Sequence, residues 1–303
     1  SDLFGAAAGG KIIRDRTFFF LNYEGQRQGS PRNFLATVPL PQWRSGDFRN
    51  TFDRNGAPVT IYDYTTTRAD PSNPGRFIRD PFPNNVIPND RIHPISRNFL
   101  NFWPEANRPG EGSAQVNNFF LSGKNVNNIN RWFSRFDHQL NDRHRLFGRF
   151  AGGQSESFPL GLVDPAFPAT AVSTNPNRNA GISLTSTFSP NFLGEFRMSY
   201  TRLQNNSRPV SEGFDMASVG FPRSLADAVT YRQIPQVQVQ QYASGSGLAV
   251  ATFGSTEVTG LGGTGRDLLP QDTWHAQYHA TWIRGRHKVK AGIDLQRMKM
   301  AAF

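Results

Sequence analysis

Hydrophobic and polar residues alternate along both arms of residues 179–203. In the first arm, Ile182, Leu184 and Phe188 fall on one face, while Ser183 and Thr185 fall on the other. The second arm continues the apolar face with Phe192, Gly194, Phe196, Met198 and Tyr200. Successive side chains of a strand point to opposite faces, so the pattern predicts a β-hairpin with one apolar and one polar wall. Each arm has about ten residues, the length of a tilted strand that crosses a bilayer.

The same alternation predicts three further hairpins. Their arms are residues 4–13 with 17–26, 131–140 with 144–150, and 274–282 with 288–296. Short polar turns at 14–16, 141–143, 189–191 and 284–286 join the arms of the four hairpins. We therefore expect eight antiparallel strands.

The connections between the hairpins are much longer than the turns, at residues 27–129, 152–178 and 204–272. Within the first, Pro41 and Pro94 indicate short helices at 41–45 and 93–102, because proline is favoured in the first helical turn. Apolar mass for a small cap comes from Phe77, Ile78, Phe82, Val86, Ile87 and Ile92. Short turns on one side and long loops on the other are typical of outer-membrane barrels. We predict an all-β fold, an antiparallel transmembrane β-barrel segment of about eight strands of a larger barrel, with short periplasmic turns and long extracellular loops at 27–129 and 204–272.

Aromatic residues gather near the strand ends on the apolar faces. Trp274 and Trp282 are separated along one strand by roughly 26 Å at ~3.3 Å per residue, which approximates the distance between two interfacial girdles. We expect the following residues to face the membrane: Trp132, Phe136, Phe188, Phe192, Phe196, Tyr200, Trp274, Tyr278 and Trp282. The alternative is an ordinary aromatic core in a soluble sheet.

Composition narrows the class of protein. The 303 residues are 37% hydrophobic, with 28 Gly, 21 Pro and 26 Phe, which suits short strands and irregular loops better than helices. No apolar run approaches the roughly 18 residues of a membrane helix. The absence of cysteine excludes disulfides and thiolate metal sites. The net charge of +10 comes from arginines scattered through turns and strands, which favours lumen and loop charge over a nucleic-acid patch.

The polar faces carry the most functional-looking group of residues. We predict contacts of the barrel lumen with a plug or a solute at Arg135, Arg145, Arg149, Glu195, Arg197, Lys288 and Lys290. The alternative, which we prefer, is a solvated wall whose charges pair with one another. In the first long loop, the candidates for aromatic side chains that stack on a ligand are Trp43, Phe48, Trp103, Phe119 and Phe120. A core for the loop itself is the preferred alternative for these aromatic residues.

Catalytic and metal chemistry find no support in the pattern. Residues 260–265 (GLGGTG) match a dinucleotide fingerprint, but the helix that must receive the pyrophosphate does not follow. His275 and His279 share a strand face roughly 13 Å apart, which is too far for one metal ion. No G-x-S-x-G nucleophile motif or calcium-loop spacing occurs. We predict no enzyme activity, no catalytic residue, no metal and no cofactor.

Four segments together resemble a known family: GGKIIRDRTFFFLNYEGQRQ (9–28), TVPLPQWRSGDF (37–48), RDPFPNNVIPNDRIHPISRNFLNFWP (79–104) and RFDHQLNDRHRLFGRF (135–150). They are similar to TonB-dependent outer-membrane receptors of the Oar-like branch, which carry a carboxypeptidase-regulatory-like domain. The resemblance implies a 22-stranded barrel, a plug and energy delivered through a TonB box. The chain begins at Ser1 without methionine, and we expect a fragment from which the plug is absent.

By this resemblance, the function is energised passage of a bulky solute across the bacterial outer membrane. The implied partners are the lipid bilayer with lipopolysaccharide, the TonB complex through the missing plug region and an unknown solute, with no nucleic acid. A passive outer-membrane channel and a surface-exposed β-rich adhesin or binding protein remain the alternatives.

Overall fold

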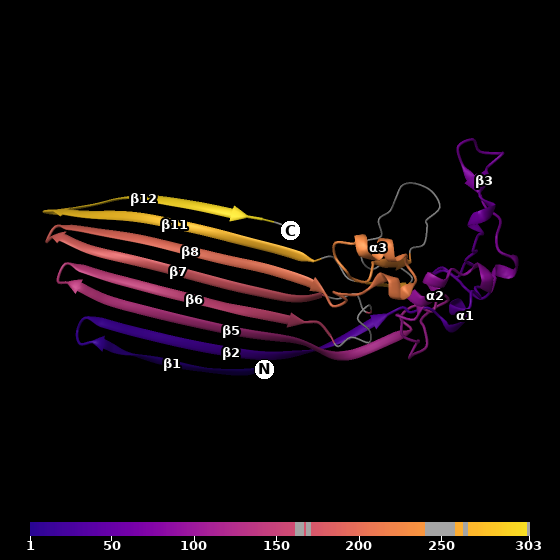
Figure 1. Cartoon of the computed structure of the whole chain (residues 1–303), viewed down its shortest axis with the longest axis horizontal. Helices are drawn as coiled ribbons and strands as arrows, with labels where there is room; N and C mark the ends of the chain where they lie inside the picture. The colour runs from indigo at the N-terminus through magenta and orange to yellow at the C-terminus, as the bar shows by residue number, and fades with distance from the viewer. Residues whose placement is uncertain (161–166, 168–170, 240–257, 263–265, 302–303) are drawn as a thin grey trace.

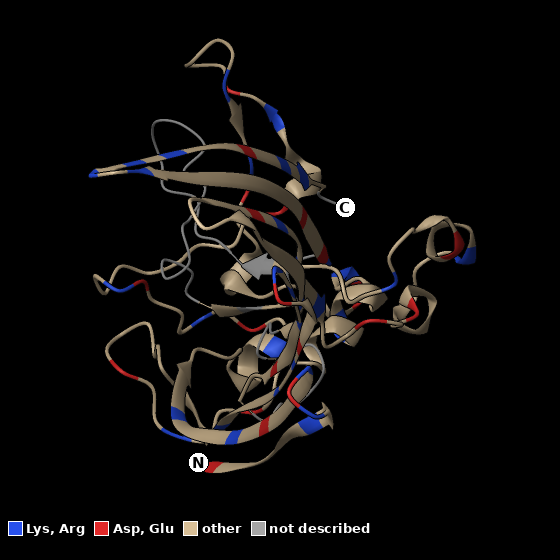
Figure 2. Ribbon diagram, turned by 90° about the vertical axis from the view of Figure 1, so that its left-hand side faces the viewer, with Lys and Arg blue, Asp and Glu red and all other residues tan. Residues whose placement is uncertain are grey.

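The computed structural model describes residues 1–160, 167, 171–239, 258–262 and 266–301. Its main feature is an eight-stranded antiparallel sheet whose strands lie side by side in the order in which they follow along the chain (Figure 1). The strands are β1 (Asp2–Ile13), β2 (Thr17–Ala36), β5 (Phe119–Asn141), β6 (His144–Phe158), β7 (Ala171–Ser189), β8 (Phe192–Pro209), β11 (Asp267–Arg284) and β12 (His287–Met300). Viewed along the strands, the sheet is an open arc whose edge strands, β1 and β12, do not meet (Figure 2).

All four hairpin turns lie at one end of the sheet, at the positions that the sequence predicts (Figure 1). Asp15 and Gly285 adopt positive φ angles of 55° and 57° in two of these turns. Such left-handed residues let a two- or three-residue loop match the twist of the strands that it joins. The connections at the opposite end are residues 37–118, 159–170 and 210–266.

The strands extend beyond their predicted ends on the long-loop side. Strand β5 has 23 residues and β2 has 20, against the ten or so that alternation indicates. The predicted loops 27–129, 152–178 and 204–272 are therefore too long, because each begins before the end of one strand and ends after the start of the next. The reason is that these extensions are rich in Asn, Ser and Gly, so they lack alternation, while backbone pairing to the neighbouring strand continues.

Cross-strand register sorts the sheet into two walls. One row of neighbours on the first wall is apolar throughout and consists of Phe19, Phe136, Gly148, Ile182, Met198, Ala276 and Leu295. The next row, on the opposite wall, contains Phe20, Arg135, Arg149, Gly181, Ser199, His275 and Gln296. We call these the apolar wall and the polar wall.

The buried core lies in a cap at the long-loop end, not in the sheet (Figure 1). Residues from both long connections form it together: Val38, Phe99 and Trp103 from the first, and Val219 and Ile234 from the second. The cap contains the short helices α1 (Pro41–Arg44), α2 (Pro94–Leu100) and α3 (Arg223–Ala228), and Phe99 projects into the core from α2. The sequence predicts α1 and α2, and the structure confirms both.

The six apolar residues predicted to supply the cap lie outside its buried cluster, so the predicted source of this core is wrong. Phe82 is buried, whereas the side chain of Phe77 is 73% exposed. Phe77 belongs to an arm of residues 53–92 that carries the short strands β3 (Arg68–Ala69) and β4 (Phe77–Ile78) and projects from the cap (Figure 1). None of the helices in the described residues is long and apolar enough to cross a membrane.

Candidate functional site

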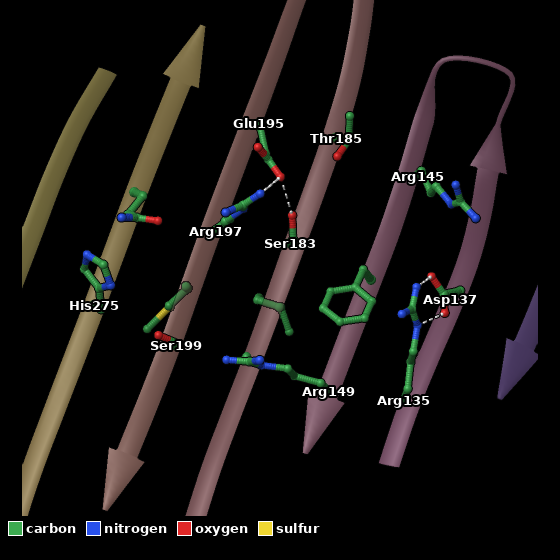
Figure 3. Close-up of a pocket in the computed structure, with 15 residues that line it drawn as sticks. Arg135, Asp137, Arg145, Arg149, Ser183, Thr185, Glu195, Arg197, Ser199 and His275 are labelled. Atoms are coloured by element: carbon green, nitrogen blue, oxygen red, sulfur yellow. Dashed lines mark hydrogen bonds and ion pairs between the residues drawn. The ribbon is translucent and has the colours of Figure 1, made fainter. Parts of the chain in front are cut away.

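A hollow of about 500 Å³ lies on the polar wall. Five neighbouring strands, from β5 to β8 and then β11, contribute to its lining (Figure 3). Side chains from so many strands can converge on one hollow only where the sheet is concave. The principal polar lining residues are Arg135, Asp137, Arg145, Arg149, Ser183, Thr185, Glu195, Arg197, Ser199, His275 and Gln277.

Register brings these residues together from distant parts of the chain. Arg135 is the direct cross-strand partner of Arg149, and Arg145 is the partner of Thr185. Arg197 lies between Ser183 on β7 and Gln277 on β11. Five of the seven predicted lumen residues therefore line one hollow: Arg135, Arg145, Arg149, Glu195 and Arg197.

Two of the four arginines are engaged by carboxylates of their own strands. Arg135 donates to Asp137, with Nε 2.6 Å from Oδ2, and its guanidinium lies 4.8 Å above the ring of Phe147. Arg197 contacts Glu195 at 2.7 Å. Ser183 also donates to Glu195 at 3.4 Å (Figure 3). These pairs hold both guanidinium groups along the wall.

Arg145 and Arg149 form no ion pair within the described part of the chain. Arg149 extends across Gly181, where an added Cβ would lie 3.5 Å from its Nε (Figure 3). The four arginines of the hollow face two carboxylates, which leaves a net charge of +2. A concave wall with unpaired guanidinium groups is suited to binding carboxylates or phosphates, which guanidinium contacts in bidentate fashion.

Lys288 and Lys290 share the polar wall but lie outside this hollow. Lys290 pairs in register with Thr281, and Lys288 with Ile283, close to the turn of the last hairpin. Neither lysine lines the hollow.

All nine predicted membrane-facing residues lie on the apolar wall. Trp132 and Phe136 lie on β5, and register places Tyr200 opposite Trp274, Phe196 opposite Tyr278 and Phe192 opposite Trp282. Phe188 stacks against Phe192 with ring centroids 5.5 Å apart. The rings of Tyr200 and Trp274 are 5.2 Å apart at the long-loop end of the band. This wall leaves large apolar side chains open, with Phe196 38% exposed and Trp282 45% exposed, which marks a surface that meets lipid or protein.

Comparison with known protein families resolves the class. The family model described as an outer membrane beta barrel domain matches residues 1–303. The chain belongs to this family. It is accordingly an all-β protein of the bacterial outer membrane, which confirms the predicted fold class and location. No curated protein matches the chain.

Among solved structures, the fold is similar to that of the outer membrane transporter YddB from Escherichia coli, with 8% sequence identity and a TM-score of 0.46. The alignment covers 99% of this chain and 25% of that chain.

The loop aromatics of the barrel domain occupy different environments. Trp103 and Phe119 are each 5% exposed and belong to the cap core, and Trp103 Nε1 donates to the Thr259 carbonyl at 2.7 Å. Trp43 stacks on Phe48 at 6.0 Å. Phe120 is 39% exposed. Two of the five aromatics thus serve the core of the cap, and ligand contact by Trp43, Phe48 or Phe120 stays a prediction.

On β11, His275 makes contacts typical of a polar wall. His275 contacts Asp294 on β12, and Gln277 donates to the same carboxylate. Within the residues that the structure describes, no group of three potential metal ligands occurs. Residues 263–265 of the glycine-rich motif lie outside the described residues, and the chain from Asp267 is strand β11.

Sequence reasoning did not single out Asp137, Phe147 and His275 as parts of the site. Asp137 orients Arg135, Phe147 lies beneath the same guanidinium, and His275 lines the far side of the hollow. Alternation does place Asp137 and His275 on the polar wall. Only the register between strands reveals that they are neighbours of the predicted arginines.

Proposed function

We propose that this barrel domain is part of a TonB-dependent receptor that moves a bulky solute across the outer membrane with energy from the inner membrane. The observation that carries the proposal is the cationic hollow on the concave polar wall. The resemblance of residues 9–150 to Oar-like receptors and the family of the barrel support it. In this account the long loops capture the solute, and a plug held by the polar wall moves to let it pass.

The proposed arrangement places lipid against the apolar wall and the lumen against the polar wall. The long connections and their cap lie outside the cell, and the short turns face the periplasm. The free edges of β1 and β12 carry unpaired backbone groups, which hydrocarbon does not tolerate. Further strands therefore pair with both edges to close a wider barrel.

Arg145 and Arg149 are the residues proposed to meet the solute or the plug. Their guanidinium groups form no ion pair within the described chain, so a carboxylate or phosphate of the lumen's occupant can bind them without breaking an existing pair. In a barrel from which the plug is deleted, their charge favours passage of anions.

Selectivity of the plug-deleted barrel tests this role. The reversal potential in a salt gradient should move toward cation selectivity when Arg145 and Arg149 are both replaced by Gln. The matched control is R143Q/R286Q, which removes two cations from the hairpin turns outside the hollow. An equal shift in the two double variants would show that Arg145 and Arg149 do not line the route of the ions through the lumen.

Energised transport is tested on the complete protein. We expect it to bind the periplasmic domain of TonB and to show no steady conductance in a planar bilayer while the plug is present. A steady conductance without TonB binding would instead identify a passive channel.

One observation favours a second function, binding at the cell surface. On the arm of residues 53–92, Tyr62, Tyr64 and Phe77 are 53%, 68% and 73% exposed. The arm holds its shape through ion pairs between Arg91 and Asp63 and between Arg68 and Asp80, each at 2.7 Å. An adhesin role predicts that deletion of residues 60–80 abolishes attachment of cells and leaves TonB binding unchanged.

A further inference from the structure

Four basic residues interrupt the apolar wall at its long-loop end. Register places Arg178 on β7 directly opposite Arg202 on β8, and Lys299 on β12 in the same row across Asp272. Arg297 lies opposite Trp274, in the next row on the same wall. We call Arg178, Arg202, Arg297 and Lys299 the girdle cluster, because it begins where the Tyr200–Trp274 aromatic pair ends.

The charge of the girdle cluster is poorly compensated. Asp272 is the one carboxylate in its row, and it accepts from the Tyr200 hydroxyl at 2.6 Å and lies 3.7 Å from Arg202 Nε. Arg178, Arg297 and Lys299 form no ion pair across the described ranges of the chain. The net charge of this patch is thus +3, from four cations and one carboxylate.

The position of Arg178 opposite Arg202 is unfavourable in the protein alone. Like charges directly opposite each other on neighbouring strands destabilise a sheet. Both residues lie next to the aromatic band, and tyrosine and tryptophan in such bands sit at the level of the lipid headgroups. An anion that binds between the two guanidinium groups would remove the repulsion, and phosphate suits their planar donor geometry.

We propose that the girdle cluster binds the phosphate groups of a lipid headgroup in the outer leaflet, namely those of lipopolysaccharide. This inference rests on the proposed orientation, in which the long loops lie outside the cell. From Arg178 to Lys299 the cluster spans three strand intervals, roughly 14 Å at ~4.8 Å each. This width allows two phosphates at opposite ends of one disaccharide headgroup to be held at once, with the acyl chains lying along the apolar wall.

Lipid-dependent stability of the complete protein in detergent tests the site. Diphosphoryl lipid A should raise the melting temperature of the wild type and bind it in native mass spectrometry. In R178S/R202S we expect apparent affinity for lipid A to fall about tenfold or more, since hydrogen bonds to charged groups are lost. Without lipid A, we expect the double variant to be about as stable as the wild type, because the repulsion between the like charges and the 3.7 Å contact of Arg202 with Asp272 are lost together.

The matched control is R143S/R286S, which removes two cations from the hairpin turns and should bind lipid A as the wild type does. Dephosphorylated lipid A should not raise the melting temperature of the wild type. Equal binding of lipid A by wild type and R178S/R202S would overturn the site. If inorganic pyrophosphate competed with lipid A when present at the same concentration as the lipid, the cluster would be a site for free phosphate. That result would overturn the lipid assignment.

A separate experiment tests the orientation on which the site rests, in which the long loops lie outside the cell. Because the chain contains no cysteine, Ser72→Cys on the arm provides a single label in it. A membrane-impermeant maleimide should label Cys at position 72 on intact cells. Lack of labelling would overturn the proposed orientation and the outer-leaflet site together. Labelling with unchanged lipid A binding in R178S/R202S would overturn the lipid site alone.

Discussion

Phe196 is a single residue at which the exposure of the apolar wall can be seen. It lies in the apolar wall between Leu184 and Tyr278 and is 38% exposed, although the sheet has no partner on that side within the described chain. In water, a row of such residues would be an aggregation hazard. In lipid, the same exposure places hydrocarbon against hydrocarbon.

Phe196→Arg should destabilise the protein in a bilayer by about 2–4 kcal/mol, the cost of a cation on the lipid face near the midplane. The control is Phe133→Arg, the same substitution on the polar wall, which we expect to cost much less because water or polar groups solvate the new charge. Arg197→Ala, on the polar wall beside Phe196, should also cost much less. Reversible urea unfolding from vesicles gives all three free energies. Equal losses for Phe196→Arg and Phe133→Arg would contradict the division into walls.

Gly152 makes room for an aromatic residue of the girdle. An added Cβ would lie 2.7 Å from atoms of the Trp132 indole, closer than real Cβ contacts allow. Gly152→Ala should therefore displace the indole and cost about 1–3 kcal/mol, as overpacking does. Gly148→Ala is the control on the same wall of the same strand, where the nearest atom is 4.0 Å away. Tryptophan fluorescence and unfolding free energy should change only in the first variant.

At the scale of elements, the cap depends on a few buried polar contacts between segments far apart in the sequence. Asn118 is 1% exposed, and its side chain accepts from Val38 N at 2.8 Å and donates to the Val38 carbonyl at 2.9 Å. Thr37 and Thr259 join the two long connections in a similar way through backbone and side-chain hydrogen bonds. The cap is therefore one unit built from both loops.

Asn118→Ala should loosen the cap without unfolding the sheet. It leaves the buried N–H and carbonyl of Val38 without partners, at about 1–3 kcal/mol for each unsatisfied group. Limited proteolysis should cleave the long loops of this variant faster, while the strands stay protected. Asn55→Ala, at an exposed position of the arm, should leave the cleavage rate unchanged.

The arm is held by exposed ion pairs, which makes its order sensitive to acid. The hydrogen bond from Arg91 holds the pKa of Asp63 well below its ordinary value of 3.8, and the hydrogen bond from Arg68 likewise lowers the pKa of Asp80. Because these folded-state pKa values are depressed, the stabilisation is fully present above pH 3.8 and disappears as the pH falls through the folded values.

Hydrogen exchange of residues 60–92 should therefore be the same at pH 7 and pH 5, after correction for intrinsic rates, and rise relative to the cap below about pH 4. High salt should weaken the same contacts, since the pairs are exposed. Unchanged protection at pH 2.5 would show that packing, and not the ion pairs, orders the arm.

At the scale of the whole molecule, the sequence predicts the hairpins because each turn is local and each strand has two chemically different walls. The turns at 14–16 and 284–286 and the side assigned to Phe196 or Arg197 all follow from alternation alone. The strand extensions escape prediction because polar residues line both of their faces, and their pairing depends on the neighbouring strand. The joint core of Val38, Trp103 and Ile234 also escapes, since no local pattern records that two loops meet.

Prediction of the candidate site follows the same division. Arg135 and Arg149 are found by alternation, but their placement opposite each other requires the register of β5 and β6. The girdle cluster was missed because Arg178 fell in a segment predicted to be loop and Arg202 stood at the edge of its strand. Both become neighbours only once β7 is seen to begin at Ala171.

The central claim is that lipid covers the apolar wall and water fills the side of the polar wall. The most direct test is a scan of single spin-labelled cysteines along residues 192–202 of β8 in the complete protein, reconstituted into vesicles. Collisions with oxygen should peak at Phe196, Met198 and Tyr200, and collisions with a water-soluble nickel chelate should peak at Glu195, Arg197 and Ser199. A profile without this two-residue period, or with the two sets exchanged, would contradict the account.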